Sequence, residues 1–101
     1  MATDGLMKTP VVFNKHYTVY LENYQGFSFI HCDCDNWSKT IKQQLQEDVS
    51  KLVELHRNPI YAFHDIEDNK HFKFLKLMSF KYFSDILCGD GKTRQLFVRG
   101  L

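Results

Sequence analysis

The stretch FIHCDCDNWSKT, residues 29–40, brings together side chains that could bind a metal or carry out redox chemistry. Zinc sites usually use four ligands, and their paired cysteines are spaced further apart than C-x-C. On a strand, Cys32 and Cys34 would share one face and His31 would point to the other. A further thiol, from Cys88, would have to come from a distant segment. We therefore predict no metal site and interpret the cysteines as small core residues.

A second candidate for chemistry is His64 with Asp65, and His71 follows a few residues later. A histidine beside a carboxylate at the end of a strand is where α/β folds often place catalytic groups. The alternative is structural: Asp65 or Asp68 caps the next helix, while His64 is partly buried against the sheet. Both interpretations remain open at this level.

Composition excludes several classes of function. The 101 residues are 44% hydrophobic and carry a net charge of +1, as expected for one small globular domain. Nucleic-acid binding normally needs a clustered basic surplus, so we do not expect it. There is no apolar run long enough to span a membrane and no signal-peptide pattern, and the cysteine count, three, is odd. We expect a cytoplasmic protein.

The pattern of residues predicts one domain over 11–101 after a flexible lead-in over 1–10. The helix prediction is clearest where apolar residues recur at spacings of three and four from Ile41 to His56, after capping residues and before Asn58-Pro59. A second helix is expected from about 69 to Met78. Strands are predicted over 11–21, 27–34, 60–66, 82–88 and 93–98, the last two joined by a Gly-Asp-Gly-Lys turn. The predicted order is β-β-α-β-α-β-β, in a mixed twisted sheet.

Aromatic residues are abundant, with nine Phe, five Tyr and one Trp. Most should fill the core. Four of them cluster near the first hairpin and turn, where some must be exposed, and tyrosine is favoured at protein interfaces. We predict a protein interface there, formed by Tyr17, Tyr20, Tyr24 and Phe27. The first strand is also a candidate sheet edge, through which a homodimer could pair.

From Phe27 onward, the order of elements and several short motifs resemble the C-terminal two-thirds of the GNAT (N-acetyltransferase) fold. The resemblance rests on the motif HFKFLKLMSFKYF and on the GDGKTRQLF hairpin. The chain is most similar to small phage proteins of the acetyltransferase-like internal virion protein family. The shared motifs are a Trp at the strand-to-helix join, His-x-x-Phe-Leu and Asp-Gly-x-x-x-Leu-Phe, matched here by Trp37, His71 to Leu75 and Gly89 to Phe97. The implied fold class is α+β, a truncated GNAT-like domain.

This resemblance implies an acetyl-CoA site at the start of the first long helix, where backbone amides hold the pyrophosphate. The matching residues are Asn36, Trp37, Ser38, Lys39 and Thr40. Asp68 stands where the family often has an Asn that holds the pantetheine arm. Ser79 takes the place of the glycine in the Gly-Phe pair, and Leu75 stands where a general-acid Tyr is common. His64, Tyr82 or Tyr61 are then the candidate catalytic residues.

Two functional hypotheses follow. Because the loop over 33–40 has no glycine and the general-acid position is Leu75, the first is a non-catalytic GNAT-like protein. It would bind a host or phage protein, as an inhibitor of a host defence or nucleic-acid-processing complex or as a virion component. The alternative is a minimal acetyl-CoA-dependent N-acetyltransferase, with acetyl-CoA as its cofactor.

Overall fold

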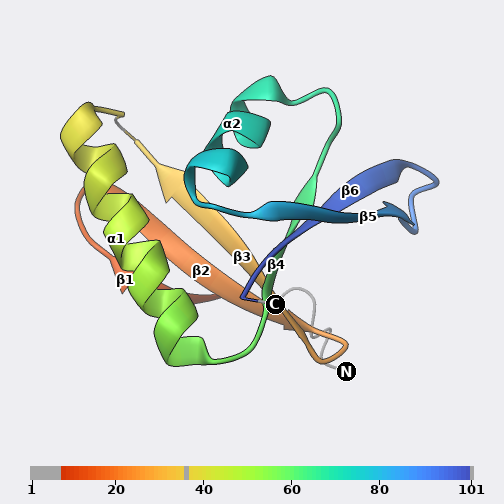
Figure 1. Ribbon diagram of the computed structural model, residues 1–101, viewed down its shortest axis with the longest axis horizontal. Helices are drawn as coiled ribbons and strands as arrows, with labels where there is room; N and C mark the ends of the chain where they lie inside the picture. Colours follow the sequence, from red (N-terminus) through yellow and green to blue (C-terminus); the bar gives the residue numbers. More distant parts are fainter. Residues whose placement is uncertain (1–7, 36, 101) are drawn as a thin grey trace.

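The computed structural model describes residues 8–35 and 37–100, which form a mixed sheet with two helices (Figure 1). Six strands lie in the order β1-β2-β3-β4-β6-β5. The strands are β1 (Lys8–Phe13), β2 (Tyr17–Tyr24), β3 (Phe27–Cys34), β4 (Ile60–His64), β5 (Lys81–Leu87) and β6 (Thr93–Arg99), and the helices are α1 (Lys39–His56) and α2 (Asn69–Leu77).

The single strand predicted over 11–21 is in fact two antiparallel strands. The side-chain oxygen of Asn14 accepts hydrogen bonds from the backbone N–H groups of His16 and Tyr17, at 2.9 and 3.0 Å, and so closes a tight turn. The sequence analysis missed this turn because it contains neither glycine nor proline. The predicted lead-in is also too long, since β1 begins at Lys8. Residues 1–7 lie outside the described part of the chain.

Helix α1 is capped by Ser38 at its N-terminus and by Arg57 at its C-terminus. The Ser38 hydroxyl accepts a hydrogen bond from the N–H of Ile41 at 3.1 Å. Ser38 is therefore the N-cap residue of α1. Arg57 ends the helix in the left-handed conformation, with φ of 61°.

Helix α2 ends in a Schellman motif centred on Ser79. The N–H of Phe80 donates to the carbonyl of Leu75 at 2.9 Å, and the N–H of Ser79 donates to that of Lys76 at 3.0 Å. Ser79 has φ of 64°, a conformation that favours glycine. The backbone thus explains why a glycine would suit the position that Ser79 occupies in the predicted Gly-Phe pair.

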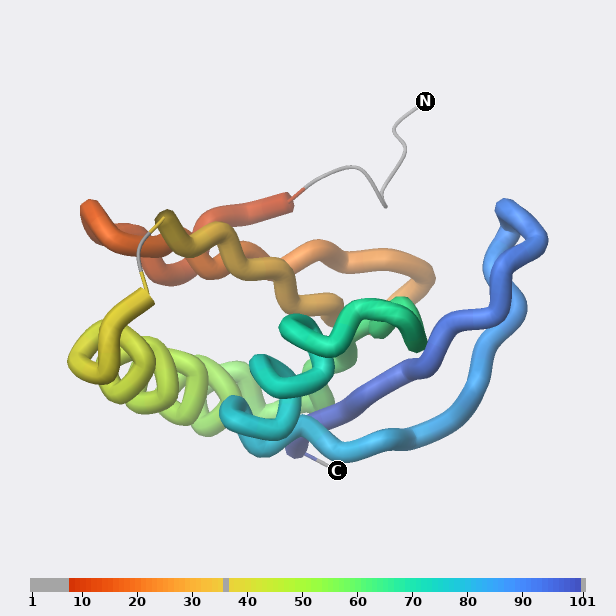
Figure 2. Tube along the Cα trace, turned by 90° about the horizontal axis from the view of Figure 1, so that it is seen from above, coloured from red at the N-terminus to blue at the C-terminus, as the bar shows by residue number. Residues whose placement is uncertain are grey.

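Both helices cover the same face of the sheet. One buried cluster contains residues of α1 and α2 together with those of the sheet, including Leu45, Val49, Ile60, Leu75 and Phe97. The Gln46 side chain also donates to the carbonyl of Leu77 at 3.0 Å, which links the two helices. Seen from above, α2 lies between the β1–β3 part of the sheet and the β5–β6 hairpin (Figure 2).

The only parallel pair among the described strands is β3 with β4, which α1 connects. It consists of two residue pairs, Ser28 with Ile60 and Phe29 with Tyr61. By contrast, β2 and β3 are paired along their whole length, from Tyr17 with Cys34 to Tyr24 with Phe27. Beyond Phe29 and Tyr61, β3 and β4 therefore diverge. This divergence positions the candidate site.

Candidate functional site: the cleft between β3 and β4

A cleft of about 870 Å³ lies where β3 and β4 separate. Its walls come from four segments: β3, β4, α2 and the residues around the start of α1. Both faces of β3 contribute. Ile30, Cys32 and Cys34 pack toward the helices, whereas Phe29, His31 and Asp33 alternate with them and point to the opposite face. The cleft therefore passes between the two strands and through the sheet.

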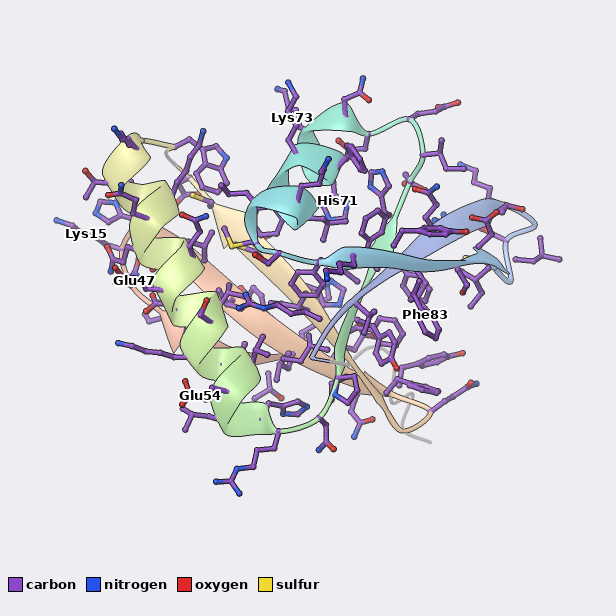
Figure 3. The ribbon with its side chains drawn as sticks, viewed as in Figure 1. Lys15, Glu47, Glu54, His71, Lys73 and Phe83 are labelled. Carbon is purple, nitrogen blue, oxygen red and sulfur yellow. The ribbon has the colours of Figure 1, made fainter. Side chains whose placement is uncertain are left out.

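Charged groups in the lining are mainly basic. Four lysines line the cleft against two aspartates, Asp33 and Asp68. Three of the four lysines come from the helices, Lys42 from α1 and Lys70 and Lys73 from α2, and Lys73 extends outward from α2 (Figure 3), whereas Lys8 comes from β1. The part of the lining that the helices supply has the charge needed to attract an anionic ligand.

Most of the predicted cofactor loop does not line the cleft. Asn36 lies outside the described residues. Ser38, Lys39 and Thr40 are exposed but are not part of the lining, while Trp37 is part of it and is 49% exposed. The Lys42 ammonium lies 5.9 Å from the centre of the Trp37 ring, so a positive charge lines the cleft from Lys42 and not from Lys39. Lys42 follows Lys39 by three residues on a helix, a spacing that could have identified it.

Asp68, the predicted pantetheine contact, lines the cleft and also caps α2. Its carboxylate accepts a hydrogen bond from the N–H of His71 at 3.0 Å. Asp65, the alternative cap, instead accepts a hydrogen bond from Arg94 at 2.9 Å. Asp68 therefore has a structural role as the cap of α2, and its contact with pantetheine stays a prediction.

His64 is a buried residue bonded to a second histidine. It is 2% exposed, and its Nδ1 atom lies 3.0 Å from the Nδ1 atom of His71. His71 lines the cleft, whereas His64 lies behind it. Burial and the neighbouring His64 lower the pKa of His71, against smaller opposing effects of Asp68 and Asp65. His71 is therefore a neutral imidazole at pH 7.

The predicted catalytic residues are not brought together. Tyr82 is 54% exposed on β5, where its hydroxyl donates to Asp85 at 3.0 Å, a bond that raises the pKa of Tyr82. It lines a separate hollow with Phe72 and Phe80. Tyr61 is buried on the opposite face of the sheet. Leu75 is buried in the helix-covered core, so no proton donor occupies the family's usual position.

The cysteines behave as partly buried core residues. Cys32 and Cys34 pack against the helix-covered core, and burial raises the pKa of Cys32 to about 12, with further contributions from Cys34 and Asp33. The Cys32 thiol is therefore protonated at neutral pH. Within the described residues, no group of three or more His, Cys, Asp or Glu side chains could hold a metal ion.

Sequence analysis missed a second polar pair at the cleft. His31 Nε2 lies 2.6 Å from the Oε1 atom of Glu22, and the two side chains are 33% and 14% exposed. In the β2–β3 register Glu22 is opposite Phe29, so it is diagonal to His31 on the same face. The signal that could have identified the pair is the Gln25-Gly26 turn, which sets this register.

The predicted interface residues divide between core and surface. Tyr17 is 2% exposed, and its hydroxyl donates a hydrogen bond to Asp48, so the interface prediction is wrong for this residue. Tyr20 is half-buried. Tyr24 and Phe27 are 42% and 51% exposed on the hairpin, where an interface could form.

An aromatic cluster covers the sheet face opposite the helices. The Phe27 and Tyr61 rings meet edge to face at 5.4 Å, and the Phe29 and Phe63 rings stack at 4.6 Å. Phe83 packs on Tyr61 and extends from β5 away from α2 (Figure 3). Three of the five rings, those of Phe27, Phe63 and Phe83, belong to exposed residues.

No protein-family model matches the chain, and no curated protein matches its sequence. Solved structures do match its fold. A GnaT-family acetyltransferase from Bordetella pertussis is similar with a TM-score of 0.65 and 8% identity, over 83% of this chain and 56% of that one. The ribosomal-protein-S5-alanine acetyltransferase from Vibrio fischeri is similar with a TM-score of 0.62 and 14% identity, over 83% and 53%.

The chain therefore has the fold of the GNAT acetyltransferases, which confirms the predicted fold class. It spans about half the length of the two structures that it matches. At identities this low, the likeness concerns the fold alone. Neither of the two described helices is long and apolar enough to cross a membrane.

Proposed function

We propose that this chain is an acyl-CoA-dependent N-acetyltransferase that binds its cofactor in the cleft between β3 and β4. The observation that carries the proposal is the divergence of the two strands after two residue pairs. Beyond Phe29, the edge of β3 that faces β4 forms no strand pairing within the described residues. Its backbone groups can therefore bond an extended, amide-containing ligand such as the pantetheine arm.

The charge of the cleft supports the same ligand. Lys42, Lys70 and Lys73 line its helix-covered side, near the start of α1, where the partial positive charge of a helix end also favours phosphate. The first turn of α1 has no acidic residue that would oppose an anion. Asp33 and Asp68 reduce the positive potential without cancelling it. In acetyl transfer, a backbone amide at the divergence would stabilise the tetrahedral oxyanion.

Calorimetry with acetyl-CoA tests the binding step. We expect micromolar binding by the wild-type chain and a clear loss of affinity in Lys42→Glu and Lys73→Glu. Lys51→Glu is the matched control, since Lys51 is exposed on α1 but is not part of the cleft lining. Lys39→Glu separates the two possible sites: it should have a smaller effect than Lys42→Glu. No binding at millimolar acetyl-CoA would rule the proposal out.

A second candidate function is supported by the exposed aromatic residues on the sheet face opposite the helices, which we call the helix-free face. In this hypothesis the chain binds a protein partner through Phe27, Phe63 and Phe83 and does not transfer acetyl groups. The roles that the phage resemblance implies, a host-directed inhibitor or a virion component in the host cytoplasm, belong here. A homodimer paired through the edge strand β1 is a further form of this hypothesis.

Affinity capture from a host lysate with wild-type chain and with Phe27→Ser/Phe83→Ser tests the second candidate. A partner retained by the wild type and lost by the double variant supports it, provided that both chains show the same circular dichroism spectrum. Equal retention would argue against this face. Analytical ultracentrifugation of the wild type tests the homodimer, which a purely monomeric sedimentation profile would exclude.

A further inference from the structure

Resting on the proposed acetyltransferase function, we propose that His31 is the general base of this site and that Glu22 is its positioning residue. The reaction assigned to the pair is deprotonation of a primary amine that carries an aromatic or apolar neighbouring group. Neither residue was singled out for this role by its sequence motif, and the assignment depends on how β2 and β3 bring the two side chains together.

The geometry of the pair sets the histidine's tautomer. Glu22 is an acceptor through Oε1, which lies 2.6 Å from His31 Nε2, so the neutral imidazole places its proton on Nε2 and donates it to the carboxylate. The lone pair is then on Nδ1, which is the atom that can take a proton. A carboxylate in this position also stabilises the imidazolium that forms. Glu22 is mostly buried, which holds this orientation.

The position of His31 suits an acceptor that enters from the helix-free side. The lysines that would hold the cofactor phosphates lie on the helix-covered side of the cleft, and His31 lines its opposite side. A thioester held between the diverging strands would therefore have the phosphates on one face and the imidazole on the other. His31 is the titratable imidazole that points into the cleft from β3; the other charged groups of the lining nearby are Asp33 and Lys8.

The wall next to His31 indicates the kind of amine. The Phe29 and Phe63 rings stack at 4.6 Å with an interplanar angle of 13°, and both line the cleft. Phe63 remains 37% exposed. A flat apolar surface of this kind favours an aromatic or aliphatic group beside the amine, because burying that group stabilises the complex.

The proposed step balances in atoms and charge. His31 Nδ1 takes a proton from the acceptor ammonium, and the resulting amine nitrogen attacks the thioester carbonyl carbon. A C–N bond forms, the C–S bond breaks, and its electron pair leaves on the cofactor sulfur. The sulfur takes up the remaining proton that the nitrogen loses, and imidazolium returns its proton to solvent.

The test measures acetyl transfer from acetyl-CoA to phenethylamine, with thiol release as the readout and acetyl-CoA affinity measured in parallel. We expect His31→Gln to lower kcat at least about a hundredfold, the usual contribution of a general base, with unchanged acetyl-CoA affinity. Glu22→Gln should lower kcat less. The controls are His16→Gln and Glu54→Gln, since neither residue lines the cleft.

A second readout separates positioning from structural support. Long-range ¹H–¹⁵N spectra of the histidines should show His31 protonated on Nε2 in the wild type, and a mixture of tautomers in Glu22→Gln. A wild-type His31 protonated on Nδ1 would overturn the assignment, as would full kcat in His31→Gln while the wild type is active. Those outcomes leave the acetyltransferase proposal standing. Absence of acetyl-CoA binding overturns both proposals, whereas acetyl-CoA binding without transfer to phenethylamine overturns only the acceptor and the base assigned here.

Discussion

The Nδ1 atoms of His64 and His71 lie 3.0 Å apart, so one imidazole donates a hydrogen bond to the other across the gap between β4 and α2. This bond needs one Nδ1 atom with a proton and one without. It connects a fully buried ring to a ring that lines the cleft. Protonation of His71 in the cleft would therefore disturb a hydrogen bond to His64 in the core.

The pair makes stability depend on pH. Because burial and His64 lower the pKa of His71 below its ordinary value of 6.5, the unfolded chain binds a proton more readily than the folded chain. The stabilisation is present above pH 6.5 and is lost as the pH falls through the folded-state pKa. We expect the free energy of unfolding, measured in urea, to decrease as the pH falls from 6.5 to the folded-state pKa of His71, and to do so less steeply in His71→Asn. His16→Asn is the control and should keep the wild-type slope.

Ser79 offers a stabilising substitution. Since its φ of 64° is unfavourable for residues with a Cβ atom, Ser79→Gly should raise the free energy of unfolding by up to about 1 kcal/mol. Gln44→Gly, at an exposed position in the regular part of α1, should instead lower it by about 0.5–1 kcal/mol. Chemical denaturation of both variants checks the prediction. A destabilised Ser79→Gly would contradict the observed backbone conformation.

The core depends on the inner face of α1. Leu45 is fully buried, and Leu45→Ala should lower the free energy of unfolding by about 2–5 kcal/mol. Leu55 on the same helix is 80% exposed, so Leu55→Ala should change the free energy of unfolding by no more than about 0.5 kcal/mol. Thermal and urea denaturation measure both. Equal effects of the two substitutions would mean that α1 does not pack on this face.

Cys32 should be chemically inert in the folded chain. Alkylation requires the thiolate, and burial raises the pKa of Cys32 to about 12. At mildly alkaline pH we expect iodoacetamide to label Cys32 far more slowly in native buffer than in urea. Mass spectrometry of peptides from a labelling time course measures the rate. Equal rates in both conditions would show that the thiol is accessible and ionised in the native state.

Much of the fold could be predicted because its signals are local. Capping residues and apolar spacing identified α1, and the Gly-Asp-Gly-Lys turn identified the last hairpin. The turn at Asn14 was missed because an asparagine side chain closes it without glycine. β4 and β5 differ from their predictions only at the ends, since Ile60–His64 is shorter and Lys81–Leu87 begins one residue earlier.

The candidate site was harder to predict because it depends on distances between elements. The His31–Glu22 pair requires the register of β2 and β3, and the position of Lys42 requires the orientation of α1 relative to the cleft. His64 was matched with its neighbour Asp65, but its partner is His71, which the start of α2 brings back to the end of β4. Spacing along the chain can suggest such residues, but their distances follow only once the elements are packed together.

Among the described residues, β3 and β4 are joined by two residue pairs, which divide the sheet into two halves. On one side stand the three strands β1, β2 and β3, and on the other β4, β6 and β5. Helix α2 lies between these half-sheets (Figure 2), and its buried residue Leu75 belongs to the core cluster that both halves share. Met78, which follows the last residue of α2, is buried in the same core and is not part of the cleft lining, so the cleft is shaped in part by a side chain that no ligand needs to touch.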